Sequence, residues 1–198
     1  FLWLPQMGMR GIMAITTFKD VVIFHGAGVG GGSLVYANTH LEPLEAFYDD
    51  PKWAHMADWR QELAPFYAEA KRMLGSAESP AIFESDEALR DVLDEMGTGD
   101  TFKRHTVGIY FGKPGEPNED PYFGGDGPAR VGCTFCGSCM VGCQVGAKNT
   151  LDKNYLYLAR QLGAEILAEH EVTDVRPLGA ADGSDGYRIE CKSSDGNR

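Results

Sequence analysis

The apolar positions along the chain follow two different periods, and each period predicts a different kind of element. Residues 20–24 form a β-branched and aromatic run that predicts a strand. Further strands are expected over residues 106–111, 164–168, 172–177 and 187–191, with a hairpin turn after the last of them.

Helical spacing is clearest after residue 58. Asp58 is the expected N-cap, Gln61 follows at the capping-box distance, and Gly75 is the expected terminator of this first helix. Pro65 is expected in the first turn or at a break. A second helix is predicted from Ser85 to Gly97, and a third over residues 150–162. Residues 112–132, rich in Gly, Pro and acids, predict a long binding loop.

These elements predict a mixed α/β protein, and the composition agrees. The chain has 198 residues with 43% hydrophobic and 24% charged side chains, which is typical of a folded globular protein. A net charge of −11 argues against a nucleic-acid partner, because phosphate contacts require clustered Lys and Arg. No apolar run reaches the roughly 20 residues of a membrane span, and no signal peptide is recognisable. We therefore expect a cytoplasmic protein that is not transmembrane.

The most informative segment follows the first predicted strand. Residues 26–32 hold five glycines in seven positions, and a short apolar stretch that can open a helix comes next. Glycines leave a backbone bare, so that a phosphate or a ring can approach it, and the N–H groups of a helix start favour an anion. The pattern G-x-G-x-x-G matches at residues 26–31, but no acidic residue ends a second strand about 20 residues later. We therefore predict a cofactor-contacting loop rather than the Rossmann fingerprint.

The residues around these glycines resemble the flavin-contacting signature of the glucose-methanol-choline (GMC) oxidoreductases. The segment Gly-Val-Gly-Gly-Gly-Ser-Leu-Val at residues 28–35 is similar in particular to the sterol-oxidising branch of that family. The resemblance continues in Tyr36-Ala-Asn-Thr39, Asp49-Asp-Pro-Lys-Trp53, Asp120-Pro-Tyr-Phe-Gly-Gly125, Gly146-Ala-Lys-Asn-Thr-Leu151 and Lys153-Asn-Tyr-Leu156. It therefore covers nearly the whole chain.

The resemblance implies a fold and a domain division. The fold would be a partial FAD-binding, Rossmann-like domain of the GMC type with part of a substrate domain. Residues 1–40 would be a flavin-contacting segment, residues 41–130 a substrate or cap segment, and residues 131–198 a Cys-rich loop with a helix and strands that return to the FAD domain. The chain then reads as a central piece of a longer protein, inactive by itself, with the catalytic base outside it.

The activity implied is the oxidation of a secondary alcohol, such as the 3β-hydroxysteroid cholesterol, by hydride transfer to FAD. Reduced flavin would pass its electrons to oxygen or another acceptor. The resemblance implies cofactor contacts by one set of residues: Gly28, Gly30, Gly31, Gly32, Ser33, Tyr36, Ala37, Asn38 and the backbone of Val172. At Tyr36 and Ala37 the chain departs from the family's usual Asn-Gly. No histidine is nominated as catalytic, and Lys148 is expected to be a surface lysine that precedes a helix.

Four cysteines form a second motif. Cys133, Cys136, Cys139 and Cys143 have the C-x₂-C-x₂-C-x₃-C spacing of bacterial ferredoxins, although Gln144 stands where Pro is usual. They could be buried structural thiols with or without a disulfide, ligands of an iron–sulfur cluster, or a zinc site. With a cluster, the protein would be a flavin dehydrogenase rather than an oxidase. A non-enzymatic metal-binding module is the remaining alternative.

Overall fold

The computed structural model describes residues 1–193 as a mixed α/β chain, as expected, whose strands pair only in twos. The expected turn after the last strand lies outside these residues. The helices are α1 (Glu45–Tyr48), α2 (Trp59–Met73), α3 (Glu84–Glu95) and α4 (Tyr155–Gln161). The paired strands are β1 (Trp3–Leu4) with β2 (Met9–Arg10), β3 (Met13–Thr17) with β4 (Val22–Gly26), β5 (Ala77–Glu78) with β6 (Thr106–Val107), β7 (Pro117–Asn118) with β8 (Arg130–Val131), and β9 (His170–Pro177) with β10 (Tyr187–Ser193).

Helix α2 begins and ends as its sequence predicts. Asp58 accepts a hydrogen bond from the Gln61 N–H at 3.2 Å, and Gly75 follows the C-cap in the left-handed conformation, at φ 56°. Pro65 lies inside the helix without ending it, contrary to the expected first turn or break. Helix α3 likewise stops before Gly97, which has a φ of 72°.

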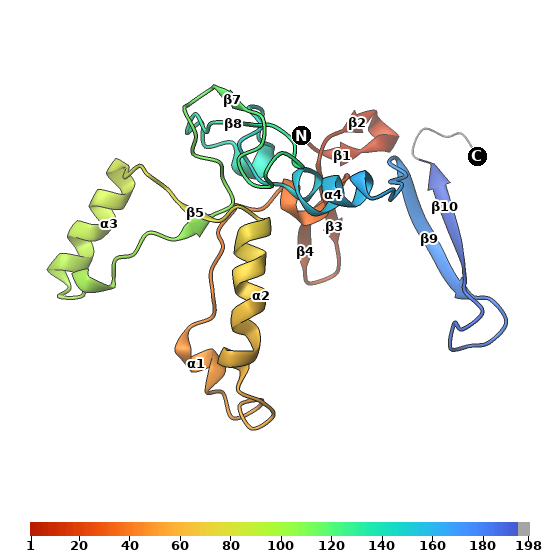
Figure 1. Ribbon diagram of the computed structural model, residues 1–198, viewed down its shortest axis with the longest axis horizontal. Helices are drawn as coiled ribbons and strands as arrows, with labels where there is room; N and C mark the ends of the chain where they lie inside the picture. The colour runs from red at the N-terminus through yellow and green to blue at the C-terminus, as the bar shows by residue number, and fades with distance from the viewer. Residues whose placement is uncertain (194–198) are drawn as a thin grey trace.

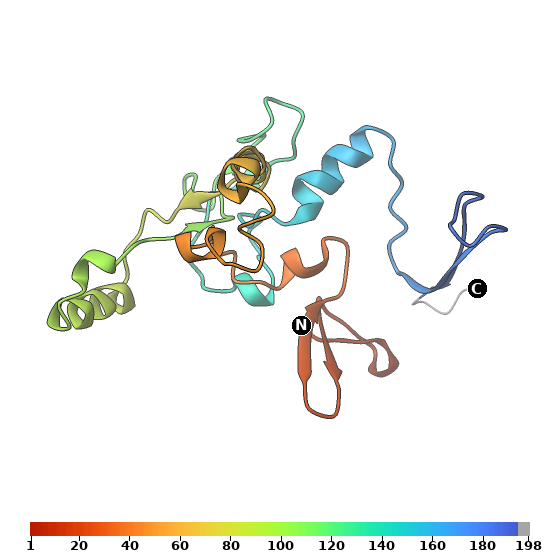
Figure 2. The same cartoon turned by 90° about the horizontal axis from the view of Figure 1, so that it is seen from below.

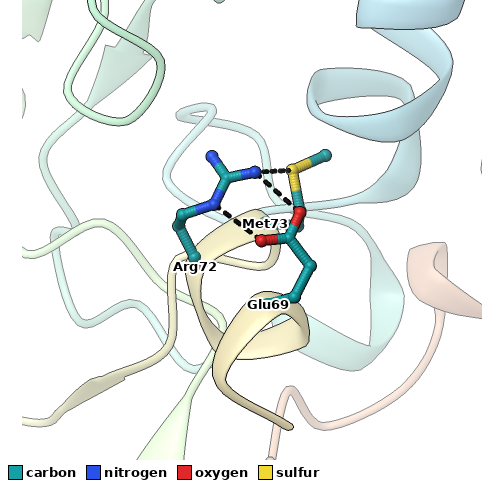
Figure 3. Close-up of polar contacts among 3 residues, drawn as sticks. All are labelled: Glu69, Arg72 and Met73. Carbon is teal, nitrogen blue, oxygen red and sulfur yellow. Dashed lines mark hydrogen bonds and ion pairs between the residues drawn. The ribbon is translucent and has the colours of Figure 1, made fainter. Parts of the chain in front are cut away.

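The last turn of α2 carries a polar cluster around its one buried residue, Met73. Arg72 donates two hydrogen bonds to the Glu69 carboxylate, at 2.9 Å from Nε and 2.7 Å from a terminal nitrogen (Figure 3). The same terminal nitrogen lies 3.2 Å from the Met73 sulfur. This exposed fork joins residues three positions apart at the end of α2.

Two predicted elements are shorter than their patterns suggest. Of the strand expected over residues 106–111, only β6 pairs with another strand. The residues that follow still form backbone hydrogen bonds, because Gly108 N–H donates to the Asn38 carbonyl and Tyr110 N–H donates to the Ala147 carbonyl. The helix expected over residues 150–162 breaks at Asn154, where a 3₁₀ turn gives way to α4. Residues 164–168, expected as a strand, are irregular.

The molecule is open, and little of it is core. Segments extend outward from a centre where the loops after β4, α2 and β8 meet, and the β9–β10 hairpin and α3 lie at opposite ends (Figures 1 and 2). The buried apolar residues of the described chain are few: Met13, Val35, Met73, Ile109 and Ala147. The accessible surface is 13825 Å², against roughly 9,000 Å² for a compact monomer of this mass. No helix within the described residues is long and apolar enough to cross a bilayer.

Candidate cofactor site

The glycine loop turns back tightly on the strand that precedes it. Strand β4 ends at Gly26, where an added Cβ would lie 2.1 Å from the carbonyl oxygen of Gly31. Gly28, Gly30 and Gly31 have φ values of 142°, 112° and 54°, which other residues rarely adopt. The helix expected after this loop is only the 3₁₀ turn η2 (Gly31–Leu34). Glycine is therefore required here for the path of the backbone.

Gly31 and Gly32 present bare backbone to open space. A Cβ added at either residue would meet no atom within 4 Å. Gly32 lacks the positive φ of its neighbours, so its own conformation does not require glycine. The space above Gly32 is thus open to a ligand that approaches the main chain.

Ser33 joins the glycine loop to the segment before α4. Its hydroxyl donates to the Gly30 carbonyl at 2.6 Å and accepts from the Leu151 N–H at 2.9 Å. Both bonds are internal to the protein, so the hydroxyl is already engaged. The predicted contact of Ser33 with a cofactor stays a prediction, and the structure adds a second role, the fixing of η2 against residue 151.

Asn38 is buried, strained and incompletely bonded. Its side chain is 2% exposed, its φ is 66°, and no partner is present for its Oδ1. A buried acceptor without a donor costs about 1–3 kcal/mol, so such an atom calls for an explanation. A ring N–H of a bound cofactor is the kind of donor that would satisfy it. Ala37 and Asn38 line an apolar pocket of about 240 Å³.

Tyr36 begins a short chain of polar side chains. Its hydroxyl lies 2.9 Å from His40 Nε2, and His40 Nδ1 lies 2.7 Å from the Ser76 hydroxyl. Burial raises the pKa of Tyr36 and lowers the pKa of His40. Tyr36 and His40 therefore remain uncharged at neutral pH, and their contact connects the glycine-loop segment to the end of α2.

Lys148 is fully buried, so its expected surface position was wrong. Its Nζ donates to the carbonyl oxygens of Leu34, Tyr36 and Cys139 at 3.0, 2.9 and 2.8 Å. Burial lowers the pKa of Lys148 to about 8. One ammonium group thus connects the segment after the glycine loop to the cysteine loop, over 112 residues of sequence in the case of Tyr36.

A second buried cation, Arg130, connects β8 to the segment between Lys148 and α4. Its guanidinium donates to Asn149 Oδ1 at 2.8 Å and to the Lys153 carbonyl at 2.5 Å. Asn149 Nδ2 in turn donates to the Tyr122 hydroxyl at 3.0 Å. Sequence reasoning did not single out Arg130, because its partners lie 19 and 23 residues away and no local pattern marks it.

The cysteine loop faces the pocket that Ala37 and Asn38 line. All four cysteines of the motif are among the residues of that pocket. None of the five cysteines forms a disulfide. Burial raises the pKa of Cys133, whereas hydrogen bonds from Ser138 lower the pKa of Cys136. The structure therefore places Cys133, Cys136, Cys139 and Cys143 beside the predicted flavin-contacting segment.

Val172 lies apart from the other predicted residues. It belongs to β9 and its side chain is 56% exposed. The β9–β10 hairpin projects away from the glycine loop in both ribbon views (Figures 1 and 2). Its predicted contact with an adenine stays a prediction.

The open backbone of the glycine loop and the buried, incompletely bonded Asn38 make this segment a candidate cofactor-binding site. No protein-family model matches the chain. It is 52% identical over 172 residues to cholesterol oxidase of Mycobacterium tuberculosis, a match that covers 84% of this chain and 30% of that protein. It is 46% identical over 201 residues to cholesterol oxidase of Acinetobacter baumannii, covering 98% of this chain and 36% of that protein.

These identities confirm the resemblance predicted from the sequence. The chain is homologous to part of these cholesterol oxidases and spans about a third of their length.

Proposed function

We propose that this chain forms the flavin-contacting part of an FAD-dependent oxidoreductase that oxidises a 3β-hydroxysteroid such as cholesterol. The observation that carries the proposal is the similarity to cholesterol oxidases over 84–98% of the chain. The bare backbone at Gly31 and Gly32 supports it, because the same segment that carries the family signature leaves room for a cofactor. In this proposal the described residues contribute part of a GMC fold, with the domain division given above.

The chemistry divides between cofactor and protein. FAD, when bound, supplies the acceptor for the hydride of the sterol's carbinol carbon, and oxygen or another acceptor reoxidises it. Gly31 and Gly32 leave the main chain accessible, and Ser33 fixes their turn against residue 151. Asn38 offers its unpaired Oδ1 to a cofactor N–H, and Tyr36 and Ala37 precede it in the same segment. No described residue is proposed as the base that removes the hydroxyl proton.

Steric exclusion at Gly32 tests the proposed cofactor contact. Because a Cβ added there meets no protein atom within 4 Å and the position has no positive φ, Gly32→Val should leave folding intact. In the full-length protein we expect normal thermal stability but at least a tenfold loss of bound FAD and of 3-ketosteroid formation. Gly115→Ala is the matched control: its site is also open, but φ is 74°, so it should lose about 1 kcal/mol of stability and keep its FAD. Full FAD content in Gly32→Val would overturn the contact.

A further inference from the structure

The four thiols of the loop after β8 border one pocket without bonding to one another. None of them is part of a disulfide. Within residues 1–193, no three His, Cys, Asp or Glu side chains are grouped so that they could hold a metal ion, so the structure supports neither the iron–sulfur nor the zinc interpretation of their spacing. The thiols are therefore available for chemistry of their own. They share one apolar cavity of about 240 Å³, bordered by Cys133, Cys136, Cys139 and Cys143.

Cys136 is the exposed thiol of this group, and polar donors surround its sulfur. The other three thiols of the loop are partly buried. Both the N–H and the hydroxyl of Ser138 donate to the Cys136 sulfur, as does the hydroxyl of Thr134. A left-handed residue, Gly137 at φ 73°, turns the chain between Cys136 and Ser138. Hydrogen bonds to a sulfur favour its thiolate, and here they lower the pKa of Cys136. Because the thiolate is the nucleophilic form, Cys136 is the reactive cysteine of the loop.

Cys133 lies three residues before Cys136 and has the opposite character. Its N–H donates to the Tyr110 carbonyl at 3.0 Å, and its sulfur accepts from the Phe135 N–H at 3.4 Å, so the residue is fixed at the pocket. Burial raises the pKa of Cys133, and the nearby sulfurs of Cys139, Cys143 and Cys136 raise it further. A partly buried thiol that keeps its proton therefore stands close to an exposed one that loses its proton more readily. Redox-active cysteine pairs commonly have this arrangement.

We infer that Cys136 is a peroxide-reactive thiol and that Cys133 closes a disulfide with it. The Cys136 sulfur attacks one oxygen of hydrogen peroxide, the O–O bond breaks and hydroxide leaves, which yields a sulfenic acid. The Cys133 sulfur then bonds to the Cys136 sulfur, the S–O bond breaks and water leaves. The two thiols lose two electrons, and the peroxide gains them. The two thiol protons end in the two waters that form.

The pocket also connects this pair with the candidate cofactor site. Ala37 and Asn38, from the predicted flavin-contacting segment, border the same cavity as the thiols. Under the proposed function, oxygen that takes two electrons and two protons from the reduced flavin leaves as hydrogen peroxide. The oxidant would then form beside Cys136. This source of peroxide rests on the proposed function, whereas the reactivity of the two thiols does not.

The test follows each cysteine of the full-length protein after reduction, removal of the reductant and addition of hydrogen peroxide without sterol. Free thiols are alkylated with one reagent, and disulfides are then reduced and alkylated with a second, so that mass spectrometry assigns every cysteine. We expect the second reagent on Cys133 and Cys136. Cys191 is the internal control, because it is also exposed but lies on β10, away from this loop in both views (Figures 1 and 2). Its thiol should disappear at least about tenfold more slowly than that of Cys136.

Two variants separate the steps. Cys136→Ser should leave Cys133 unoxidised at the same peroxide concentration. Cys133→Ser should leave a sulfenic acid on Cys136, which dimedone traps. Cys136 is exposed, so its replacement leaves folding intact, which circular dichroism checks.

Three results would overturn the inference. One is loss of the Cys191 thiol as fast as that of Cys136. Another is a disulfide that joins Cys136 to a cysteine other than Cys133. The third is a Cys133→Ser variant without a dimedone adduct on Cys136. Because the peroxide is added and neither flavin nor sterol takes part, a protein without FAD would contradict the proposed function and leave this site standing.

Discussion

Lys148 touches Tyr36 twice with one ammonium group. Its Nζ donates to the Tyr36 carbonyl oxygen at 2.9 Å and lies 4.8 Å from the centroid of the Tyr36 ring. The same Nζ donates to the carbonyl oxygens of Leu34 and Cys139 at 3.0 and 2.8 Å. The two loops that carry the cofactor and cysteine motifs are therefore held at a fixed separation by a side chain that belongs to neither.

Removing the Lys148 ammonium should lower the free energy of unfolding. Lys148→Met leaves the Leu34, Tyr36 and Cys139 carbonyls without their donor inside the protein, at about 1–3 kcal/mol for a buried polar group. We expect a loss of at least about 2 kcal/mol in urea unfolding of the full-length protein. Lys113→Met is the control, because this exposed lysine makes only a surface ion pair and should change stability by less than about 0.5 kcal/mol. Equal effects of the two replacements would refute the role given to Lys148.

The hydroxyl of Ser33 offers a second test. Ser33→Ala removes both the bond to Gly30 and the bond from Leu151, so the glycine turn loses its tie to the segment before α4. We expect about 1–2 kcal/mol less stability and several-fold weaker FAD binding, measured by fluorescence of released flavin. Ser184→Ala, in the exposed turn between β9 and β10, serves as the control and should change neither quantity. A Ser33→Ala protein with unchanged flavin affinity would contradict the proposed coupling.

Asp120 makes stability depend on acid pH. Desolvation by itself would raise the pKa of Asp120, but N–H groups of Tyr122, Phe123, Gly125 and Gly127 together outweigh it and lower the pKa from 3.8 to about 2. A pKa lowered by folding contributes stability that is fully present above pH 3.8 and is lost as the pH falls to about 2.

Asp120→Asn should therefore lower stability at pH 5 to 7 and cost progressively less between about pH 4 and 2. Urea unfolding of the wild-type and variant proteins across this range measures the difference. Asp126 lies in the same loop and accepts none of these four hydrogen bonds. The stability difference between Asp126→Asn and wild type should therefore not shrink as the pH falls. If the difference between Asp120→Asn and wild type were constant with pH, the carboxylate would not be the cause.

The large accessible surface predicts how the 198-residue chain behaves alone. Apolar residues on α3 remain exposed, among them Leu89 and Val92 at 53% and 50%, as do its C-cap residue Met96 at 68% and Val175 on β9 at 54%. Exposed apolar patches of this extent promote association. We expect the isolated chain to bind the dye ANS strongly and to unfold without a sharp transition. The full-length protein should bind little ANS and unfold in one sharp transition. Cooperative unfolding with no ANS binding would contradict this prediction.

Local signals in the sequence predicted local structure well. Asp58 and Gly75 marked the limits of α2 because capping depends on residues three or four positions apart. Gly97 marked the end of α3 for a similar reason, since a left-handed backbone after a helix is a property of a single residue. The family resemblance added the flavin interpretation, which spacing alone could not supply.

Long-range contacts were not predictable from these patterns. The burial of Lys148 depends on carbonyls 9 to 114 residues away, and the break at Asn154 reflects a side chain that is buried and caps α4 itself. A buried polar centre of Lys, Arg and Asn side chains leaves no apolar period in the sequence. The same is true of the four thiols, whose spacing predicted a motif but not the pocket that they share.

The most direct test of the proposed function is an anaerobic titration of the full-length protein with cholesterol, followed by absorption spectroscopy. We predict that about one equivalent of the 3β-alcohol bleaches the flavin bands and yields one equivalent of the 3-ketosteroid, while the 3α epimer leaves the spectrum unchanged. A protein that carries no flavin, or whose flavin no 3β-hydroxysteroid reduces, would contradict the account.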